Sequence, residues 1–315
     1  MARPPKNLLI PTRDGISPSC VALPATGADC PWPTTVDFLA ERLPAVTRED
    51  WCRRMASGEV LDDAGQPVHA DAPYRGGQRL YYWRTLPHEH RVPFEATVLH
   101  LDEHLLVADK PHFLPVTPTG RFVRETLLVR LKRSTGIDSL SPIHRIDRET
   151  AGLVLFSVRP QDRGAYQALF RARQVDKTYE AIAPGPAEGA ALHSATVIQR
   201  SRIEEDPSAF FRMIETDGEA NSETRITLTE RRGTWARYAL APVTGKRHQL
   251  RVHMNALGLP IAGDQFYPTV RRGPGEPEDY AEPLRLLARS IAFTDPVTGQ
   301  PRRFDSRLAL AWPGA

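Results

Sequence analysis

Cysteine and long apolar runs are scarce in this sequence. Only three cysteines, Cys20, Cys30 and Cys52, occur among 315 residues. Their number is odd and none belongs to a Cys-x-x-Cys pair, which excludes a disulfide framework and a structural zinc site. No segment approaches the roughly 20 apolar residues of a membrane helix, and the apolar stretch near the N-terminus is too short for a signal peptide. We therefore expect an intracellular, cytoplasmic protein with no membrane association.

Motifs for common cofactors are also missing. The Gly-Lys pair at 245–246 would belong to a phosphate-binding loop only with glycine at 240 and Ser or Thr at 247, where Leu240 and Arg247 stand. His88 and His90 form a His-x-His pair without further ligands nearby in sequence. We expect neither a cofactor nor a metal ion.

The overall composition is typical of a soluble globular protein with about two domains. Lys and Arg number 41 and Asp and Glu 38, and the net charge of +3 permits an anionic partner without requiring one. Proline accounts for 29 residues, about 9% against a usual value near 5%, which indicates many loops and short elements. We divide the chain into an N-terminal arm (1–33), a small domain (34–84), a linker (85–95) and a larger domain (96–315).

The small domain is predicted to contain two short helices followed by a small sheet. The first helix covers 36–43 with Thr35 as its N-cap, and the second begins after Thr47 and ends at Gly58. This order resembles the S4 RNA-binding module. Residues 1–84 contain ten basic and ten acidic side chains, so a docking domain without an RNA role is the alternative.

The larger domain is predicted to be α+β. Its segment 152–158 is almost continuously apolar, as expected for a central, buried strand. Successive strands often lack an intervening helix, which favours a mixed, largely antiparallel central sheet flanked by helices. We predict strands at 104–110, 152–158, 175–183, 222–230, 234–242 and 286–293, and helices at 125–134, 161–174 and 245–258.

The densest polar segment is HRIDRETAG at 144–152, immediately before the predicted central strand. Asp147 lies between Arg145 and Arg148, and these cations favour its charged form. Such a carboxylate can act as a nucleophile or a base. A structural Arg–Asp ion pair is the alternative.

Two further segments carry polar groups suited to a site. Arg247 and Arg251 are four residues apart and are predicted to share a helix face, with Lys246 adding to the positive field. Such a face suits phosphates or a buried carboxylate. Strand alternation places Lys177 and Tyr179 on one face, so that both could enter a pocket, although a strand tyrosine is usually part of a core.

In this order and spacing, the segments resemble the pseudouridine synthases of the group that includes RluA. HRIDRETAGLVLF resembles that family's H-R-L-D-R-x-T-S-G-L-L-L-F segment, and DKTYEA is similar to K-x-Y-x-A. TGKRHQLRVHMNALGLPIAGDQFY resembles T-G-R-x-H-Q-[IL]-R-x-H with the following G-x-P-[IL]-x-G-D-x-x-Y. LDEHLLVADKPHFLPVTP and LLARSIAFTDPVTGQPRRF are similar to the first and closing strands, so the resemblance covers about residues 96–310.

Four departures from the family pattern bear on substrate choice. Ile146 replaces leucine, Ala151 replaces serine, Lys246 replaces arginine, and Pro-His-Phe at 111–113 stands where many members have Pro-x-Gly. None of them alters the aspartate, the tyrosine or the final arginine of the motifs.

The resemblance implies an isomerase that converts uridine in RNA to pseudouridine without a cofactor. Asp147 would attack C1′ or C6 of the nucleotide, or deprotonate C2′. Arg251 would pair with Asp147, and Tyr179 would stack on the base and assist proton removal at C5. The uridine must be flipped out of the RNA stack, and Arg145 would fill the vacated space.

The remaining candidates are contacts to the substrate. Arg148, Lys177, Lys246, His248 and Leu250 are expected to bind it, and surface arginines are expected to meet phosphates. The latter are Arg124, Arg130, Arg133, Arg171 and Arg173. We expect a monomer that acts on rRNA or tRNA. The alternatives are a non-catalytic RNA-binding protein of the same fold, acting in ribosome assembly, and a hydrolase that uses Asp147 on another nucleoside or nucleotide.

Overall fold

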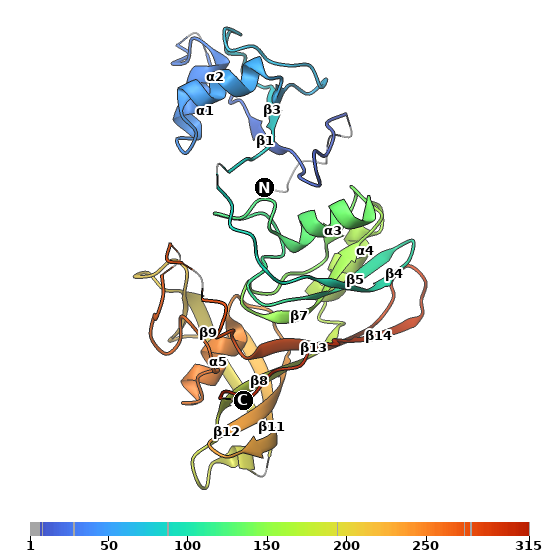
Figure 1. The fold of residues 1–315 in the computed structure, drawn as a ribbon, viewed down its shortest axis with the longest axis vertical. Coiled ribbons are helices and arrows are strands. Elements are labelled where there is room, and N and C mark those ends of the chain that lie inside the picture. Colours follow the sequence, from blue (N-terminus) through green and yellow to red (C-terminus); the bar gives the residue numbers. More distant parts are fainter. Residues whose placement is uncertain are drawn as a thin grey trace. The chain divides into compact units, whose positions relative to one another are not determined.

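The computed structural model describes residues 7, 9–27, 29–86, 88–193, 195–273, 275–277 and 279–314. The chain forms two compact units (Figure 1). The small unit comprises residues 1–89, 120–124 and 129–138, and the large unit comprises 90–119, 125–128 and 139–315. The chain first passes between them after Glu89, within the segment predicted as a linker. Parts of the predicted N-terminal arm, residues 1–6, 8 and 28, lie outside the described residues.

The small unit contains a three-stranded antiparallel sheet and two helices. The sheet has the order β1-β3-β2. Its elements are β1 (Ser19–Ala22), α1 (Thr35–Arg42), α2 (Arg48–Ala56), β2 (Val60–Leu61) and β3 (Arg79–Tyr82). The predicted arm (1–33) is not separate from the small domain at 19–23, because residues 19–22 pair with β3 and Leu23 is buried in the core. The likeness to the S4 module stays a prediction.

The first helix begins one residue earlier than predicted. The hydroxyl of Thr34 accepts the amide N–H of Asp37, and the Asp37 carboxylate accepts the amide of Thr34. This reciprocal capping box makes Thr34 the N-cap, while Thr35 is buried inside the helix. Thr47 caps α2 as expected.

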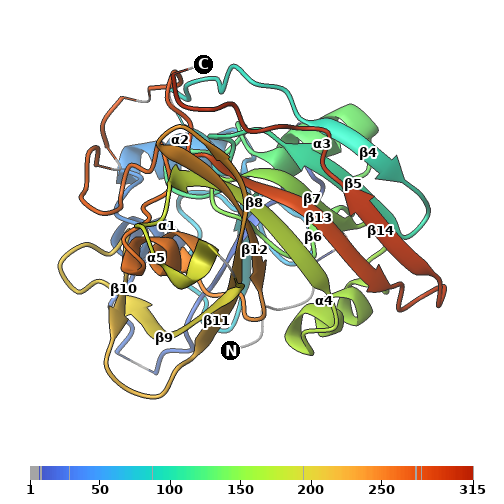
Figure 2. The same cartoon turned by 90° about the horizontal axis from the view of Figure 1, so that it is seen from below.

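The large unit is built on a mixed, mostly antiparallel sheet (Figure 2). Within the described residues it has 11 strands in the order β10-β9-β11-β12-β8-β13-β7-β5-β4, with β14 beside β13 and β6 beside β7. The pairing of β13 with β7 is parallel, and the other pairings there are antiparallel. The predicted α+β class is therefore confirmed. The strands are β4 (Thr97–Leu101), β5 (Leu105–Lys110), β6 (Ser141–Pro142), β7 (Ala151–Ser157), β8 (Asp176–Pro184), β9 (Val197–Glu205), β10 (Met213–Thr216), β11 (Ser222–Arg232), β12 (Trp235–Pro242), β13 (Leu286–Thr294) and β14 (Pro301–Asp305).

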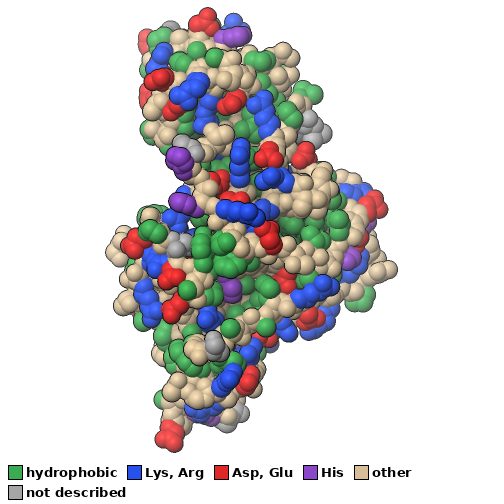
Figure 3. Space-filling model, viewed as in Figure 1, with side chains coloured by type: hydrophobic (Ala, Val, Ile, Leu, Met, Phe, Trp, Pro, Cys, Tyr) green, Lys and Arg blue, Asp and Glu red, His purple; other side chains and the backbone are tan. Residues whose placement is uncertain are grey.

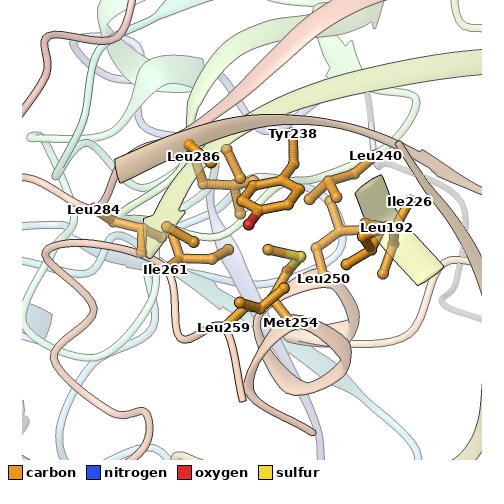
Figure 4. Packing of buried hydrophobic residues seen from close by; sticks show 13 residues of the cluster. Leu192, Ile226, Tyr238, Leu240, Leu250, Met254, Leu259, Ile261, Leu284 and Leu286 are labelled. Atoms are coloured by element: carbon orange, nitrogen blue, oxygen red, sulfur yellow. The ribbon is translucent and has the colours of Figure 1, made fainter. Parts of the chain in front are cut away.

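Helices complete the fold. They are α3 (Leu127–Thr135), α4 (Arg163–Arg171) and α5 (Gln249–Ala256), with the short 3₁₀ helix η1 at Ala191–His193. The side chains of Leu250 and Met254 point from α5 toward Tyr238 and Leu240 of β12, forming the core of this part of the sheet (Figure 4). Burial of these apolar groups fixes the face that α5 turns to the sheet.

Gly152 permits the central strands to pair closely. It has φ of 107°, and a Cβ atom at this position would lie 2.3 Å from the carbonyl oxygen of Ala288. Any other residue would push β7 away from β13. The strand that follows the Asp147 loop can therefore dock on its neighbour only with glycine at its second position.

Candidate active site

Three neighbouring strands bring the candidate residues together. Asp147 lies in the loop between β6 and β7. Gly152, at the start of β7, pairs with Ala288 of β13, which in turn pairs with Tyr179 in the middle of β8. One strand, β13, thus separates Tyr179 from the strand that follows the Asp147 loop, although more than thirty residues lie between Asp147 and Tyr179 in sequence.

Arg251 is a fully buried cation held by Asp264. Its Nε and Nη2 donate to the two oxygens of Asp264 at 2.8 and 2.6 Å. Its third nitrogen, Nη1, lies 3.6 Å from Oδ2 of Asp147 and 3.7 Å from Oε2 of Glu149. Burial alone would lower the pKa of Arg251, but the carboxylates outweigh it and raise the pKa. The guanidinium is therefore a permanent positive charge beside Asp147.

Asp147 is near this charge without being fully enclosed. Its side chain remains 25% exposed, while that of Arg251 is 0% exposed. Nη1 of Arg251 makes no hydrogen bond to any described residue. The 3.6 Å separation is an electrostatic contact and is too long for a hydrogen bond. Asp147 thus lies close to a buried cation and is accessible, which a reacting carboxylate requires.

Glu149 is a second buried carboxylate at the same point. Its Oε1 accepts from Nε and Nη2 of Arg148 at 3.0 and 2.8 Å. Burial would raise the pKa of Glu149, but Arg148 and Arg251 outweigh it and lower the pKa to about 2. Arg148 is therefore engaged by its own neighbour, and the Asp147 loop carries an internal ion pair.

Lys110, the last residue of β5, is hydrogen-bonded to the backbone of the Asp147 loop. It is fully buried, and its Nζ donates to the carbonyl oxygens of Pro111, Leu114 and Arg148 at 2.9, 2.8 and 2.9 Å. Burial lowers the pKa of Lys110 to about 7, while Glu149 and Asp147 favour its charged form. Three acceptors match the three hydrogens of an ammonium group. Lys110 thus fixes the backbone of the residue next to Asp147.

Tyr179 presents a phenol to the same site. Its ring packs against the core of the large unit, and the side chain is half-buried. Burial, together with the nearby charge of Asp147, raises the pKa of Tyr179. The hydroxyl therefore stays protonated through neutral pH. A neutral phenol beside a carboxylate can donate a proton or stack on a planar ring.

His248 precedes α5 and lies on the aromatic pair Phe266 and Tyr267. Its ring stacks on Phe266 with centroids 5.8 Å apart, and Nδ1 is 3.1 Å from the Tyr267 hydroxyl. That hydroxyl already donates its single hydrogen to the carbonyl of Met213. Nδ1 must therefore be the donor, which leaves Nε2 without a proton when the ring is neutral. Burial lowers the pKa of His248, so the neutral form prevails.

The other expected substrate contacts differ in exposure. Arg145 and Lys246 are exposed, and Lys177 is half-buried, where burial lowers its pKa. Leu250, however, is 8% exposed and belongs to the hydrophobic core under α5. The structure shows Leu250 as a packing residue, and its contact with substrate stays a prediction.

One expectation about α5 is wrong. Arg247 and Arg251 do not share a helix face, because α5 begins at Gln249 and Arg247 lies before it. The exposed Arg247 donates to the carbonyl oxygens of Phe210 and Phe211, whereas Arg251 is buried. The left-handed conformation of His248, with φ of 53°, breaks the helical register between the two arginines.

The arginines expected to meet phosphates lie at the surface to different degrees. Arg133 binds Asp14 at 3.0 Å, and the neighbouring Lys132 is 4% exposed and donates to Ser17. On the face drawn in Figure 3, Lys and Arg side chains are interspersed with Asp and Glu. Arg124, Arg133, Arg171 and Arg173 are exposed and Arg130 is half-buried.

Comparison with known proteins identifies the family. Residues 104–256 match the family model described as RNA pseudouridylate synthase. An uncharacterized RNA pseudouridine synthase of Synechocystis is 34% identical over 244 residues, covering 76% of this chain and 79% of that protein. The dual-specificity RNA pseudouridine synthase RluA of Salmonella typhi is 32% identical over 214 residues, covering 66% of this chain and 90% of that protein. The chain belongs to the RNA pseudouridine synthases, within the RluA family.

The fold agrees with this assignment. The structure of human RNA pseudouridylate synthase domain containing 1 superposes with a TM-score of 0.54 at 20% identity, covering 68% of this chain and 84% of that chain. This pseudouridine synthase is therefore an RNA-modifying isomerase, as the resemblance implied. Among the described residues, no helix is long and apolar enough to cross a membrane, and no group of three or more His, Cys, Asp or Glu side chains could hold a metal ion.

Several site residues of this pseudouridine synthase were not selected from sequence. Lys110, Glu149 and Asp264 all lie inside the segments that carried the resemblance, but their burial is visible only in the structure. Asp264 follows Gly263, where a Cβ atom would meet the carbonyl oxygen of Pro283 at 2.2 Å. The Gly-Asp pair in GDQFY was therefore the available signal: a glycine imposed by close packing, followed by a carboxylate.

Proposed function

We propose that Asp147 is the group that reacts with a uridine of rRNA or tRNA, and that Arg251 and Tyr179 assist it. In the isomerisation, the bond from C1′ to N1 of uracil breaks and a bond from C1′ to C5 forms. N1 gains a hydrogen and C5 loses one, so no oxidant, reductant or water is consumed. Attack at C1′ or C6 and deprotonation at C2′ all require the charged carboxylate.

A single observation carries this proposal: an accessible carboxylate lies 3.6 Å from a buried guanidinium that another carboxylate already holds. If Arg251 served only to neutralise Asp147, one bidentate pair between them would suffice. Instead Asp264 fixes the cation, and its third nitrogen supplies positive potential to Asp147. Prearranged charge of this kind stabilises an ionised reacting group without a rearrangement during the reaction.

Tyr179 and Arg145 supply the contacts with the nucleotide. The phenol is held protonated beside Asp147, so it can stack on uracil and relay the proton that leaves C5. Arg145 is exposed next to the reacting carboxylate, where its planar cation can occupy the gap left by the flipped nucleotide. We expect the protein to act as a monomer in the cytoplasm.

The test combines pseudouridine mapping with one conservative substitution. RNA from cells that lack the gene should lose pseudouridine at one or more uridines, and the wild-type gene should restore it. Asp147→Asn should restore none, while the purified variant binds RNA as the wild type does. Asp305→Asn, at an exposed carboxylate bound to Arg303, serves as the matched control.

The alternatives give different outcomes. A non-catalytic RNA-binding protein would leave the pseudouridine map unchanged when the gene is deleted. A hydrolase would release free base or leave abasic positions in place of pseudouridine. Restoration of pseudouridine by Asp147→Asn would show that another group carries the reaction.

A further inference from the structure

The loop between β9 and β10 exposes an aromatic ring to solvent. Phe210 is 76% exposed, the highest value among the large hydrophobic side chains described as exposed. A single exposed apolar residue is ordinary on a protein surface and does not by itself indicate a binding site. The contacts that hold this loop are what distinguish Phe210.

Arg247 clamps the backbone that carries the ring. Its Nη1 donates to the carbonyl of Phe210 at 3.0 Å, and its Nη2 donates to the carbonyl of Phe211 at 2.9 Å. Asp206 tightens the start of the same loop by accepting the amide and hydroxyl of Ser208 at 2.9 and 2.6 Å. A planar guanidinium bound to two successive carbonyls fixes the direction of the backbone. The exposed ring is thus held in place by polar contacts of its backbone.

A series of aromatic contacts connects this ring to the active site. Phe210 meets Phe211 edge-on with ring centroids 5.6 Å apart, and Phe211 lies 5.2 Å from Phe266. Phe266 stacks on His248, and the guanidinium carbon of Arg251 is 5.0 Å from the centre of the Phe266 ring. The loop therefore rests on the residues that surround the cation next to Asp147.

The charges around Phe210 favour nucleic acid as the occupant. Arg247 lies 3.9 Å from the exposed Glu205 but keeps a side chain that is 43% exposed, and the adjacent Lys246 is exposed as well. An aromatic face flanked by cations is the combination with which proteins hold unpaired nucleotides, since any base can stack while the backbone is attracted electrostatically. A protein-docking surface would require a broader apolar patch than one ring.

We propose that Phe210 stacks on an unpaired base of the substrate RNA close to the flipped uridine, and that Arg247 is the positioning residue for this ring. The proposal rests on the proposed function, because it assumes that RNA reaches Asp147. Arg247 then binds backbone carbonyls of the protein, and the ring of Phe210 contacts the RNA.

Binding of two oligonucleotides without uridine tests the stacking separately from the chemistry. The probes are a fluorescein-labelled cytidine 12-mer and a 12-mer of abasic ribose phosphate. Phe210→Ala should weaken binding of the cytidine oligonucleotide about 5- to 150-fold, the range of base–aromatic stacking, and leave the abasic one unchanged. Phe210→Trp should retain the affinity, whereas Phe210→Leu, which is apolar without a π-face, should behave like Phe210→Ala. Ile198→Ala, at a 48% exposed position on β9, is the control.

Arg247→Lys separates the two possible roles of that cation. Lysine keeps the charge but cannot bind two carbonyls in one plane, so a positioning role predicts the same base-dependent loss as Phe210→Ala. A phosphate-binding role predicts near wild-type affinity for both probes and would overturn the assignment of Arg247. Equal weakening of both probes by Phe210→Ala, or none, would overturn the stacking proposal. The loss should also persist in the Asp147→Asn background, so failure of the catalytic proposal would be seen separately.

Discussion

Nε and Nη2 of Arg251 bind both carboxylate oxygens of Asp264, and Nη1 is left 3.6 Å from Oδ2 of Asp147. The bidentate pair is buried, with side chains 0% and 1% exposed. A buried ion pair is costly to form but far more costly to break, because the remaining charge has no water to solvate it. The orientation of the cation toward Asp147 is thus maintained by a buried carboxylate, Asp264.

Removal of either member of this pair should destabilise the protein by about 3–5 kcal/mol. Asp264→Leu and Arg251→Met each leave one member of the pair buried without its partner, whereas the double variant removes both members and should be more stable than either single variant. All three should lose pseudouridine formation. Urea unfolding of the four proteins forms a double-mutant cycle, and strictly additive losses would show that the two charges are not coupled.

Tyr179→Phe should reduce turnover about 10²- to 10⁴-fold, the usual contribution of a positioned acid or base, while RNA affinity is retained because the ring remains. Release of tritium from RNA labelled at uridine C5 measures this turnover directly. Because the pKa of Tyr179 is raised, wild-type activity should show no alkaline decline from this residue below about pH 10. A fully active Tyr179→Phe enzyme would remove the hydroxyl from the mechanism.

Glu149 should contribute to acid sensitivity. Its pKa is lowered from 4.5 to about 2 in the fold, so the unfolded chain takes up this proton first as pH falls. The stabilisation is present above pH 4.5 and is lost as pH drops toward 2, by on the order of 3 kcal/mol. Urea unfolding of wild type and Glu149→Gln between pH 7 and 3 measures it. The variant should be less stable at pH 7 and flatter below pH 4.5, and parallel curves would contradict this account.

The backbone conformation of Phe113 leads us to predict the order of stability of two variants at this position. It occupies the position where the family pattern has glycine, and its φ of 66° is left-handed, at a cost of about 1 kcal/mol or more. Its ring is nevertheless 4% exposed and packs on Phe94 and Tyr280. Phe113→Gly should be less stable than wild type because the buried ring is lost, and Phe113→Ala less stable still because the strain remains. Thermal unfolding gives the order, and an alanine variant more stable than the glycine variant would disprove the strain.

The local pattern of apolar and capping residues in the sequence determined much of the fold. Strand β7 was predicted from an uninterrupted apolar run, and Thr47 and Gly58 mark the limits of α2 as expected. Strands β9 and β10 were not predicted, because β9 carries many charged residues and exposes one face. Apolar runs and helix-capping residues are short-range signals. They do not reveal a strand that is stabilised by its neighbours in the sheet and not by its own composition.

The sequence alone determined the family and selected Asp147, Tyr179 and Arg251 as candidate site residues, because motif order is a property of the chain. Tertiary structure decided how these groups are held. Burial and pairing between distant segments fix Arg251 on Asp264, anchor Lys110 to the carbonyl of Arg148, and bring the Phe210 loop onto Phe266. Distances and desolvation depend on which segments meet in space, and no local pattern of residues encodes them.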